Sequence, residues 1–320
     1  VKLATPDTVA TLVAPCGTDL DATMLDDLRD EYGVLTSVEA LAHVRTTPGE
    51  TIWYEGETMR WENHGWEGWP DLCAWQPVLP RADAYHIIVE GGGGGEVRAA
   101  QAALAAAAGE QKRPWLSVEP VMHEVTAQAV ASLASLTAQA DVCSPDLRTA
   151  RRMAALAAAD TEASACAKKP AAAVDADADA TPAYTDAEAG VANMDADDLG
   201  PLSEAALASV ARRCALVLRL RASATLAIRD GARGSLLLSD GELTRVPAVT
   251  VTAVDPTGAG NAYAGALGAL LAGGRPTHEA AAVASAVGAA FCRVDGWPSA
   301  AEAAWVSARA MELPRRGARS

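Results

Sequence analysis

AVDPTGAGNAYAGAL, residues 253–267, places two glycines at the start of a helix of small apolar residues. Gly258 and Gly260 flank Ala259, and glycine lets a backbone adopt positive φ angles and approach a ligand closely. The unpaired N–H groups and the dipole at a helix start attract anions. The stretch therefore predicts an anion site at the first turn of this helix. The alternative is an ordinary turn between a strand and a helix.

The length and net charge of the chain limit the fold and the classes of partner that we expect for it. Its 320 residues are enough for one large α/β domain or two smaller ones. The formal net charge is −15, whereas a nucleic-acid-binding surface needs a basic face, so we expect no nucleic-acid partner. No uncharged apolar run reaches the roughly 18 residues of a membrane span, and we expect no membrane partner either.

The cysteines indicate a reducing compartment. Six cysteines lie far apart in the sequence and form no CxxC pair. Such thiols are typical of reduced, mostly buried cysteines, so a cytoplasmic location is expected. A metal site built from these cysteines is the alternative.

The order of apolar runs and helical patterns predicts an α/β fold with a mostly parallel sheet covered by helices. The predicted strands, some with the loop that follows them, are residues 8–15, 84–90, 114–120, 140–146, 225–230 and 235–240. The predicted helices are residues 21–34, 97–108, 202–222, 258–272, 278–292 and 299–311, with one more between the third and fourth strands. Two β-prone runs around Glu55 and Gly56 predict a hairpin at residues 51–63.

Residues 157–200 break this order. Ten acidic residues and two lysines give this segment a net charge of −8, more than half of the total. The segment has few large apolar side chains, so burial cannot offset the entropy lost on ordering. We predict a disordered, acidic insertion rich in alanine and aspartate. An acidic docking segment is the alternative function for it.

The longer string DPTGAGNAYAGALGALLAGG, residues 255–274, resembles the carboxy-terminal signature of the ribokinase/PfkB carbohydrate-kinase family. That signature reads D-[TP]-T-G-A-G-D, followed by an aromatic residue and small residues. Residues 16–34 are similar to the family's early G-x-D segment and helix, and residues 227–238 to its strand–G-x-x-G–strand beside the nucleotide. Residues 278–292 are similar to its closing helix.

The resemblance implies a ribokinase-like fold, a three-layer α/β/α sandwich with a mostly parallel sheet and a small β lid over the substrate. Residues 1–156 and 201–312 would form this single domain, with the lid at about residues 38–66 and a tail at residues 313–320. In this family the lids can pair, so a monomer or a homodimer formed through the lid is expected.

The resemblance also implies an activity. The family transfers the γ-phosphoryl group of ATP, with Mg²⁺, to a hydroxyl of a sugar or nucleoside-like small molecule. The motif positions of the anion hole and of the catalytic base are here Gly258, Ala259, Gly260 and Asn261. The residues that would border ATP are Arg229, Asp230, Gly231 and Gly234. Asp255 and Thr257 match the family's loop for a monovalent cation, K⁺.

The sequence departs from the family pattern at the position of the base. An aspartate accepts the proton of the hydroxyl in the family, whereas Asn261 offers an amide without useful basicity. Asn261 can still orient a hydroxyl, and general-base help supplies about 10² to 10⁴ in rate, so slow transfer is expected.

Two further departures concern the metal and the substrate. The family's N-x-x-E element for Mg²⁺ falls on Asp146 and Thr149, which keeps one oxygen ligand and loses the glutamate. Glu119 is a substitute acid, or alternatively a strand-end carboxylate that caps a loop. The family's amino-terminal glycine-rich element for substrate is not found after Val1. Either residues that precede Val1 supply it or substrate binding is impaired.

The asparagine and the preceding Pro256 resemble a divergent fungal and algal branch of the family, in which this asparagine is a feature of the branch. We interpret the chain as a slow carbohydrate kinase. The alternative is a catalytically inactive protein that binds a nucleotide or metabolite and acts through a partner.

Overall fold

The computed structural model describes residues 2–16, 19–40, 49–55, 58–64, 79–89, 95–108, 113–122, 125–167, 202–299 and 302–312. Residues 168–200 of the predicted insertion and the tail at 313–320 lie outside these ranges.

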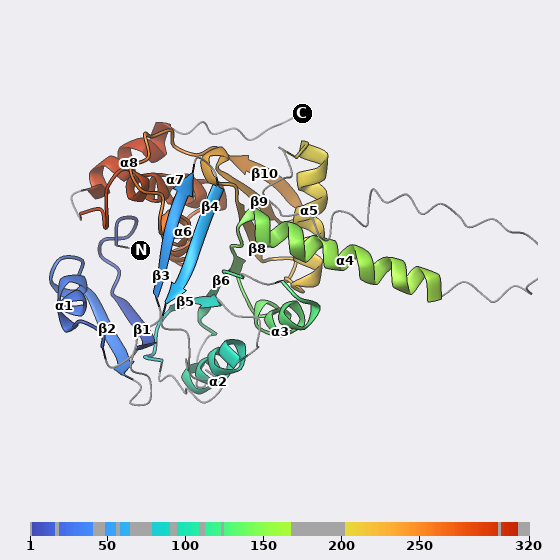
Figure 1. Ribbon diagram of the computed structural model, residues 1–320, viewed down its shortest axis with the longest axis horizontal. Helices are drawn as coiled ribbons and strands as arrows, with labels where there is room; N and C mark the ends of the chain where they lie inside the picture. Colours follow the sequence, from blue (N-terminus) through green and yellow to red (C-terminus); the bar gives the residue numbers. More distant parts are fainter. Residues whose placement is uncertain are drawn as a thin grey trace, which may run out of the picture.

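A six-stranded sheet with the order β10-β9-β8-β7-β6-β5 forms the middle layer (Figure 1). Four strands are parallel, as predicted: β5 (Ala84–Val89), β6 (Trp115–Pro120), β7 (Val142–Cys143) and β8 (Thr225–Arg229). Two antiparallel strands complete the sheet: β9 (Ser235–Ser239) and β10 (Glu242–Val246).

The sequence reading missed β10. Asp240 and Gly241 join β9 to β10 and have φ angles of 52° and 80°. A two-residue Asp-Gly connection with positive φ at both positions is a strong hairpin signal. This signal was present in the sequence and predicts the strand that follows.

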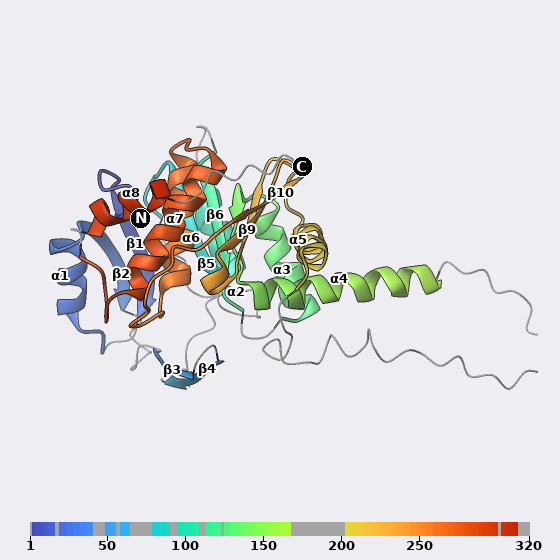
Figure 2. The same cartoon turned by 90° about the horizontal axis from the view of Figure 1, so that it is seen from above.

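Two helical layers cover the sheet, one on each face, as Figure 2 shows. The first layer contains α2 (Gly95–Ala108), α3 (Ala127–Thr137), α4 (Leu147–Ala167) and α5 (Glu204–Val217). The second contains α6 (Ala259–Ala272), α7 (Thr277–Cys292) and α8 (Glu302–Glu312). Leu226 and Ile228 of β8 face the first layer and Ala227 faces the second, because successive strand residues point to opposite faces.

The remaining elements lie beside this sandwich. β1 (Ala10–Cys16) and β2 (Val34–Ala40) form a parallel two-stranded sheet, and α1 (Ala22–Asp30) connects them. β3 (Gly49–Glu55) and β4 (Thr58–His64) form an antiparallel hairpin that stands apart from the large sheet in Figure 2. The hairpin predicted at residues 51–63 is confirmed, whereas β2 was not predicted.

Helix α4 was not among the helices predicted from the sequence. It continues to Ala167 and projects beyond the sheet (Figure 1). Residues 157–167, for which the sequence predicted disorder, are therefore helical. They are rich in alanine, which has the highest helix propensity, and the first proline after them is Pro170.

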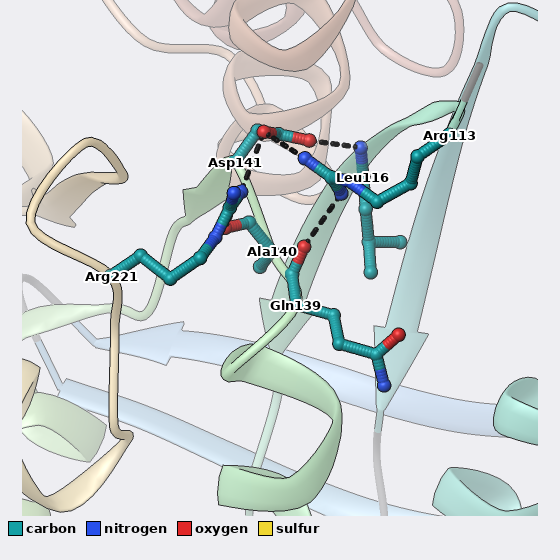
Figure 3. Close-up of polar contacts among 6 residues, drawn as sticks. All are labelled: Arg113, Leu116, Gln139, Ala140, Asp141 and Arg221. Carbon is teal, nitrogen blue, oxygen red and sulfur yellow. Dashed lines mark hydrogen bonds and ion pairs between the residues drawn. The ribbon is translucent and has the colours of Figure 1, made fainter.

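An ion-pair network joins three strands at the edge of the sheet where the parallel strands begin. The two carboxylate oxygens of Asp141, just before β7, accept three hydrogen bonds (Figure 3). Arg113 donates at 2.6 Å, Arg221 at 2.7 Å and the backbone N–H of Leu116 at 2.8 Å. Burial raises the pKa of Asp141, but the hydrogen bonds from Arg113, Leu116 and Arg221 lower it more, so the net pKa lies below its ordinary value.

We expect Asp141→Asn to destabilise the fold by about 2 kcal/mol at neutral pH, because a charged acceptor is lost from hydrogen bonds with two arginines. The lowered pKa means that the carboxylate stabilises the fold fully above its ordinary value of 3.8 and loses this effect as pH falls through its folded-state value. Urea unfolding of both proteins between pH 7 and pH 2 measures the difference.

The difference in the free energy of unfolding between the wild type and Asp141→Asn should become smaller as pH falls below about 4. Asp7→Asn, at an exposed aspartate, serves as the control and should unfold at the same urea concentration as the wild type. A difference that stays constant down to pH 2 would contradict the assigned pKa direction.

Candidate active site

The candidate site lies at the edge of the sheet where the parallel strands end. Glu119 is the penultimate residue of β6, Asp146 follows β7, and Arg229 ends β8. A backbone bridge pairs Asp146 with Arg229, which places the last two side by side. In open α/β sheets, ligands bind beyond the carboxyl ends of the strands, so this edge is where a ligand is expected.

The first turn of α6 stands over this edge and has the geometry of an anion site. Gly258 is the N-cap residue of α6 and has a φ angle of 76°, a conformation that favours glycine. The amide of Ala259 donates to the carbonyl of Pro256 at 3.2 Å, a turn contact. The amides of Gly260 and Asn261 have no partner within the helix, because the first N–H groups of a helix precede every available carbonyl. The Asn261 side chain is exposed on this turn.

The loop that leads into the turn is fixed by hydrogen bonds. Asp255 accepts the N–H of Thr257 at 2.9 Å, which closes a small local turn. The backbone N–H groups of Val254 and Asp255 both donate to the carbonyl of Cys292 at the end of α7, at 2.6 and 3.3 Å. The predicted cation loop is thus attached to the carboxyl end of α7.

Glu119 is buried in a polar network beneath α6. It is fully buried, and its Oε1 accepts from Nη1 of Arg229 at 2.5 Å. Its Oε2 contacts Nε2 of His86 at 3.1 Å, and Nδ1 of His86 contacts the Ser117 hydroxyl at 2.8 Å. Both oxygens of Glu119 therefore have partners within the protein. Within the described residues, Glu119 does not cap a neighbouring loop, which was the alternative role for this carboxylate.

Sequence reasoning missed His86 and Ser117. The parallel register of β5 and β6 pairs these two residues directly, and Glu119 lies two residues further along the same face. Each residue looks isolated in the sequence. A polar residue at every second position of an otherwise apolar strand, as in LSVE, was the available signal.

The set of Ser117, His86 and Glu119 has the residue types of a hydrolase triad, but its geometry excludes that chemistry. Ser117 is only 2% exposed. Gly268 of α6 covers it so closely that a Cβ on Gly268 would lie 2.8 Å from the Ser117 hydroxyl oxygen. A substrate carbonyl has no access to a nucleophile covered in this way. The three side chains instead form a hydrogen-bonded support for α6, in which Ser117 and Glu119 are buried and His86 is partly exposed.

The residues predicted to border ATP have clear roles within the protein. Arg229 turns inward to Glu119 and is 11% exposed, while Asp230 is buried and accepts from Arg233 at 2.7 Å and from Arg245 at 3.3 Å. Gly231 and Gly234 have φ angles of 52° and 94° in the connection between β8 and β9. Gly234 is required by that connection, because a Cβ there would clash with the carbonyl oxygen of Val246, whereas at Gly231 the conformation only favours glycine.

Asp146 caps helix α4. Its Oδ1 accepts the N–H of Thr149 at 2.8 Å, and its Oδ2 accepts the Thr149 hydroxyl at 2.9 Å. Thr149, which replaces the expected glutamate, therefore holds the remaining acid in place. Among the described residues, no three His, Cys, Asp or Glu side chains gather as a metal-binding group, so Asp146, Glu119 and Asp255 do not form one.

Comparison with known proteins shows what the chain resembles. The sequence profile of the pfkB family carbohydrate kinases matches residues 84–303. Among proteins of curated function, none matches the chain in sequence. Within the part of the chain that the structure describes, no helix has the length and apolar character needed to cross a bilayer.

Several solved structures share the fold. A putative ribokinase II from E. coli in complex with ATP and Mg²⁺ is 17% identical with a TM-score of 0.57, covering 96% of this chain and 86% of that chain. A ribokinase from Cryptococcus neoformans var. grubii in complex with ADP is 14% identical with a TM-score of 0.58, covering 92% and 82%. A nucleoside kinase from Methanocaldococcus jannaschii is 12% identical with a TM-score of 0.56, covering 97% and 83%. These similarities confirm the predicted ribokinase-like fold with its mostly parallel sheet and small antiparallel lid region.

We expect Gly260→Ala to destabilise the protein by about 1–3 kcal/mol, because a Cβ at this position would lie 2.7 Å from Nη1 of Arg229. The arginine cannot move away freely, since Glu119 holds it. Chemical denaturation measures the change.

Gly273→Ala, at the C-cap of the same helix, is the control. Its φ angle is −74°, and a Cβ there would meet only carbonyl oxygens at an ordinary 3.5 Å. This variant should stay within about 0.5 kcal/mol of the wild type. Equal destabilisation by the two alanines would contradict the close packing of Arg229 against Gly260.

Proposed function

The chain belongs to the pfkB family of carbohydrate kinases, and on that premise we propose that it transfers the γ-phosphoryl group of ATP, with Mg²⁺, to a hydroxyl of a sugar or nucleoside-like small molecule. The family consists of phosphotransferases with an alcohol group as acceptor. The observation that carries the proposal is the first turn of α6, where Gly258 has positive φ and the amides of Gly260 and Asn261 have no partner within the helix.

The residues present fit the phosphates of ATP better than they fit a dedicated metal site. Amide N–H groups at a helix start bind phosphate oxygens, and the helix dipole adds to the attraction. Mg²⁺ in kinases is held by one or two carboxylates, water and the substrate phosphates. Asp146 fits this role because it is partly exposed and each of its oxygens retains a lone pair. Glu119 does not fit, because it is fully buried and paired with Arg229.

We also propose a K⁺ site at Asp255, because one of its oxygens is available to a cation. One oxygen of Asp255 accepts the N–H of Thr257, and the other has no hydrogen bond among the described residues. A cation there would further secure the loop that leads into the first turn of α6.

In this proposal the protein supplies positioning and charge, which account for most of the catalysis of phosphoryl transfer. The amides of the first turn of α6 would stabilise the negative charge on the transferred group. Asn261 would orient the acceptor hydroxyl through its amide oxygen, but it would not take the proton. Transfer should therefore be slow, because the proton leaves without a positioned base.

A second function remains a candidate, namely binding of a nucleotide or metabolite without catalysis, to act on a partner. The observation in its favour is that no free carboxylate occupies the position of the base, while Glu119 and Asp146 are engaged within the protein. We propose that Asn261 is a shared feature of the divergent branch that the motif resembles. Under either function the phosphates would lie at the first turn of α6.

We expect Asn261→Asp to raise the rate of phosphoryl transfer by about 10² to 10⁴, because an aspartate restores the general base. The measurement is transfer of label from γ-labelled ATP, with Mg²⁺ and K⁺, to a mixture of sugars and nucleosides. Asn261→Ala, which has neither base nor amide, is the matched control and should be slower than the wild type.

The outcomes separate the two functions. Label transfer by the wild type establishes a working kinase and identifies the acceptor class. If neither the wild type nor Asn261→Asp transfers label, but both bind ATP, the result supports the binding protein instead. Failure of both proteins to bind ATP would overturn the kinase and also the form of the second function in which the ligand is ATP.

A further inference from the structure

We propose that Arg229 is a positioning residue of the phosphate site: Glu119 holds its guanidinium beneath the first turn of α6, where it adds a fixed positive charge to the anion site. The inference rests on the proposed function for the identity of the ligand. It concerns a side chain that faces the protein interior and acts through the first turn of α6 without touching the ligand.

The guanidinium lies directly under the first turn of α6. A Cβ built on Gly260 would be 2.7 Å from Nη1 and 3.5 Å from Cζ of Arg229. No side chain fits between the guanidinium and the backbone of α6. The absence of a side chain at Gly260 therefore lets the guanidinium approach the amide groups that would bind phosphate. Close packing against Arg229 is thus a reason for glycine at this position.

Glu119 determines where the charge lies along the helix. Arg229 lies under Gly260, whereas Ser117, the hydroxyl partner of His86, lies under Gly268, two turns further along α6. Glu119 contacts both Arg229 and His86 and thus lies between these two positions. The positive end of the ion pair therefore points toward the start of α6, in the same sense as the helix dipole.

This arrangement disfavours the empty site and favours an anion. A cation beside a helix start is repelled by the dipole, and buried charges are screened little by water or salt. The Nε of Arg229 is also buried and has no hydrogen-bond partner among the described residues. An unsatisfied buried donor lowers stability. A polyphosphate at the first turn of α6 would relieve the repulsion between the guanidinium and the helix start.

The experiment compares the binding of three probes by calorimetry: tripolyphosphate, ATP with Mg²⁺, and adenosine. Tripolyphosphate carries the phosphate charge without the nucleoside, and adenosine carries the nucleoside without the charge. We expect Arg229→Met to weaken tripolyphosphate and ATP about tenfold or more and to leave adenosine binding unchanged. Arg229→Lys, which keeps the charge, should recover part of the loss.

The effect of lost stability on binding must be distinguished from the effect of the lost charge, because Arg229→Met leaves Glu119 buried without its main partner. The double variant Glu119→Gln, Arg229→Met removes both charges and should recover most of the lost stability. We expect its affinity for tripolyphosphate to stay as low as that of Arg229→Met. Asp141→Asn, at the opposite edge of the sheet, is the control for destabilisation alone and should bind tripolyphosphate as the wild type does.

Each outcome decides the inference. Recovery of tripolyphosphate affinity in the double variant would overturn it, since stability would then be the only role of Arg229. Equal tripolyphosphate binding by the wild type and Arg229→Met, or no binding by the wild type, would also overturn it. If the wild type binds tripolyphosphate in an Arg229-dependent manner but does not bind ATP, the inference stands while the proposed function fails.

Discussion

The buried ion pair between Glu119 and Arg229 determines how helix α6 lies on the sheet. The pair is formed by the carboxyl ends of β6 and β8, and α6 covers it. A charge pair in this position requires partners for its remaining hydrogen-bonding groups and a helix surface without side chains above it. His86 meets the first requirement for Glu119, whereas Nε of Arg229 has no hydrogen-bond partner among the described residues, and Gly260 meets the second requirement. The candidate anion site and the polar network beneath it therefore depend on the same residues of α6.

The sheet has different electrostatic characters at its two edges. At the edge where the parallel strands begin, Asp141 is the common acceptor for two partly exposed arginines, and the network ties strand starts together. At the other edge the acid is buried and the arginine points toward a helix start. The first arrangement stabilises the fold. The second places charge where a phosphate ligand is proposed to bind, and it leaves one arginine donor unsatisfied.

The acids around the candidate site differ in a consistent direction from those that the motif resemblance implied. Position 261 has an amide, position 149 has a hydroxyl that donates a hydrogen bond to Asp146, and Glu119 is paired with Arg229. Fewer unpaired carboxylates make the edge more positive, which favours phosphate binding and weakens proton abstraction. This electrostatic balance is common to a slow kinase and to a nucleotide-binding protein.

Four features could be predicted from the sequence alone: the family motif, the alternation of strands and helices, the hairpin at residues 51–63 and the need for glycine at position 258. These features follow from local backbone geometry and from the periods of strands and helices, which neighbouring residues reveal. Helix α4, which continues to Ala167, was not predicted. The acidic composition of residues 157–200 indicated disorder, although the alanines of residues 157–167 favour a helix. The contacts among Glu119, Arg229 and His86, and the space that Gly260 and Gly268 leave for this network, could be seen only in the folded protein. Glu119 and Arg229 are 110 residues apart, and their contact depends on strand order and register, which no local period records.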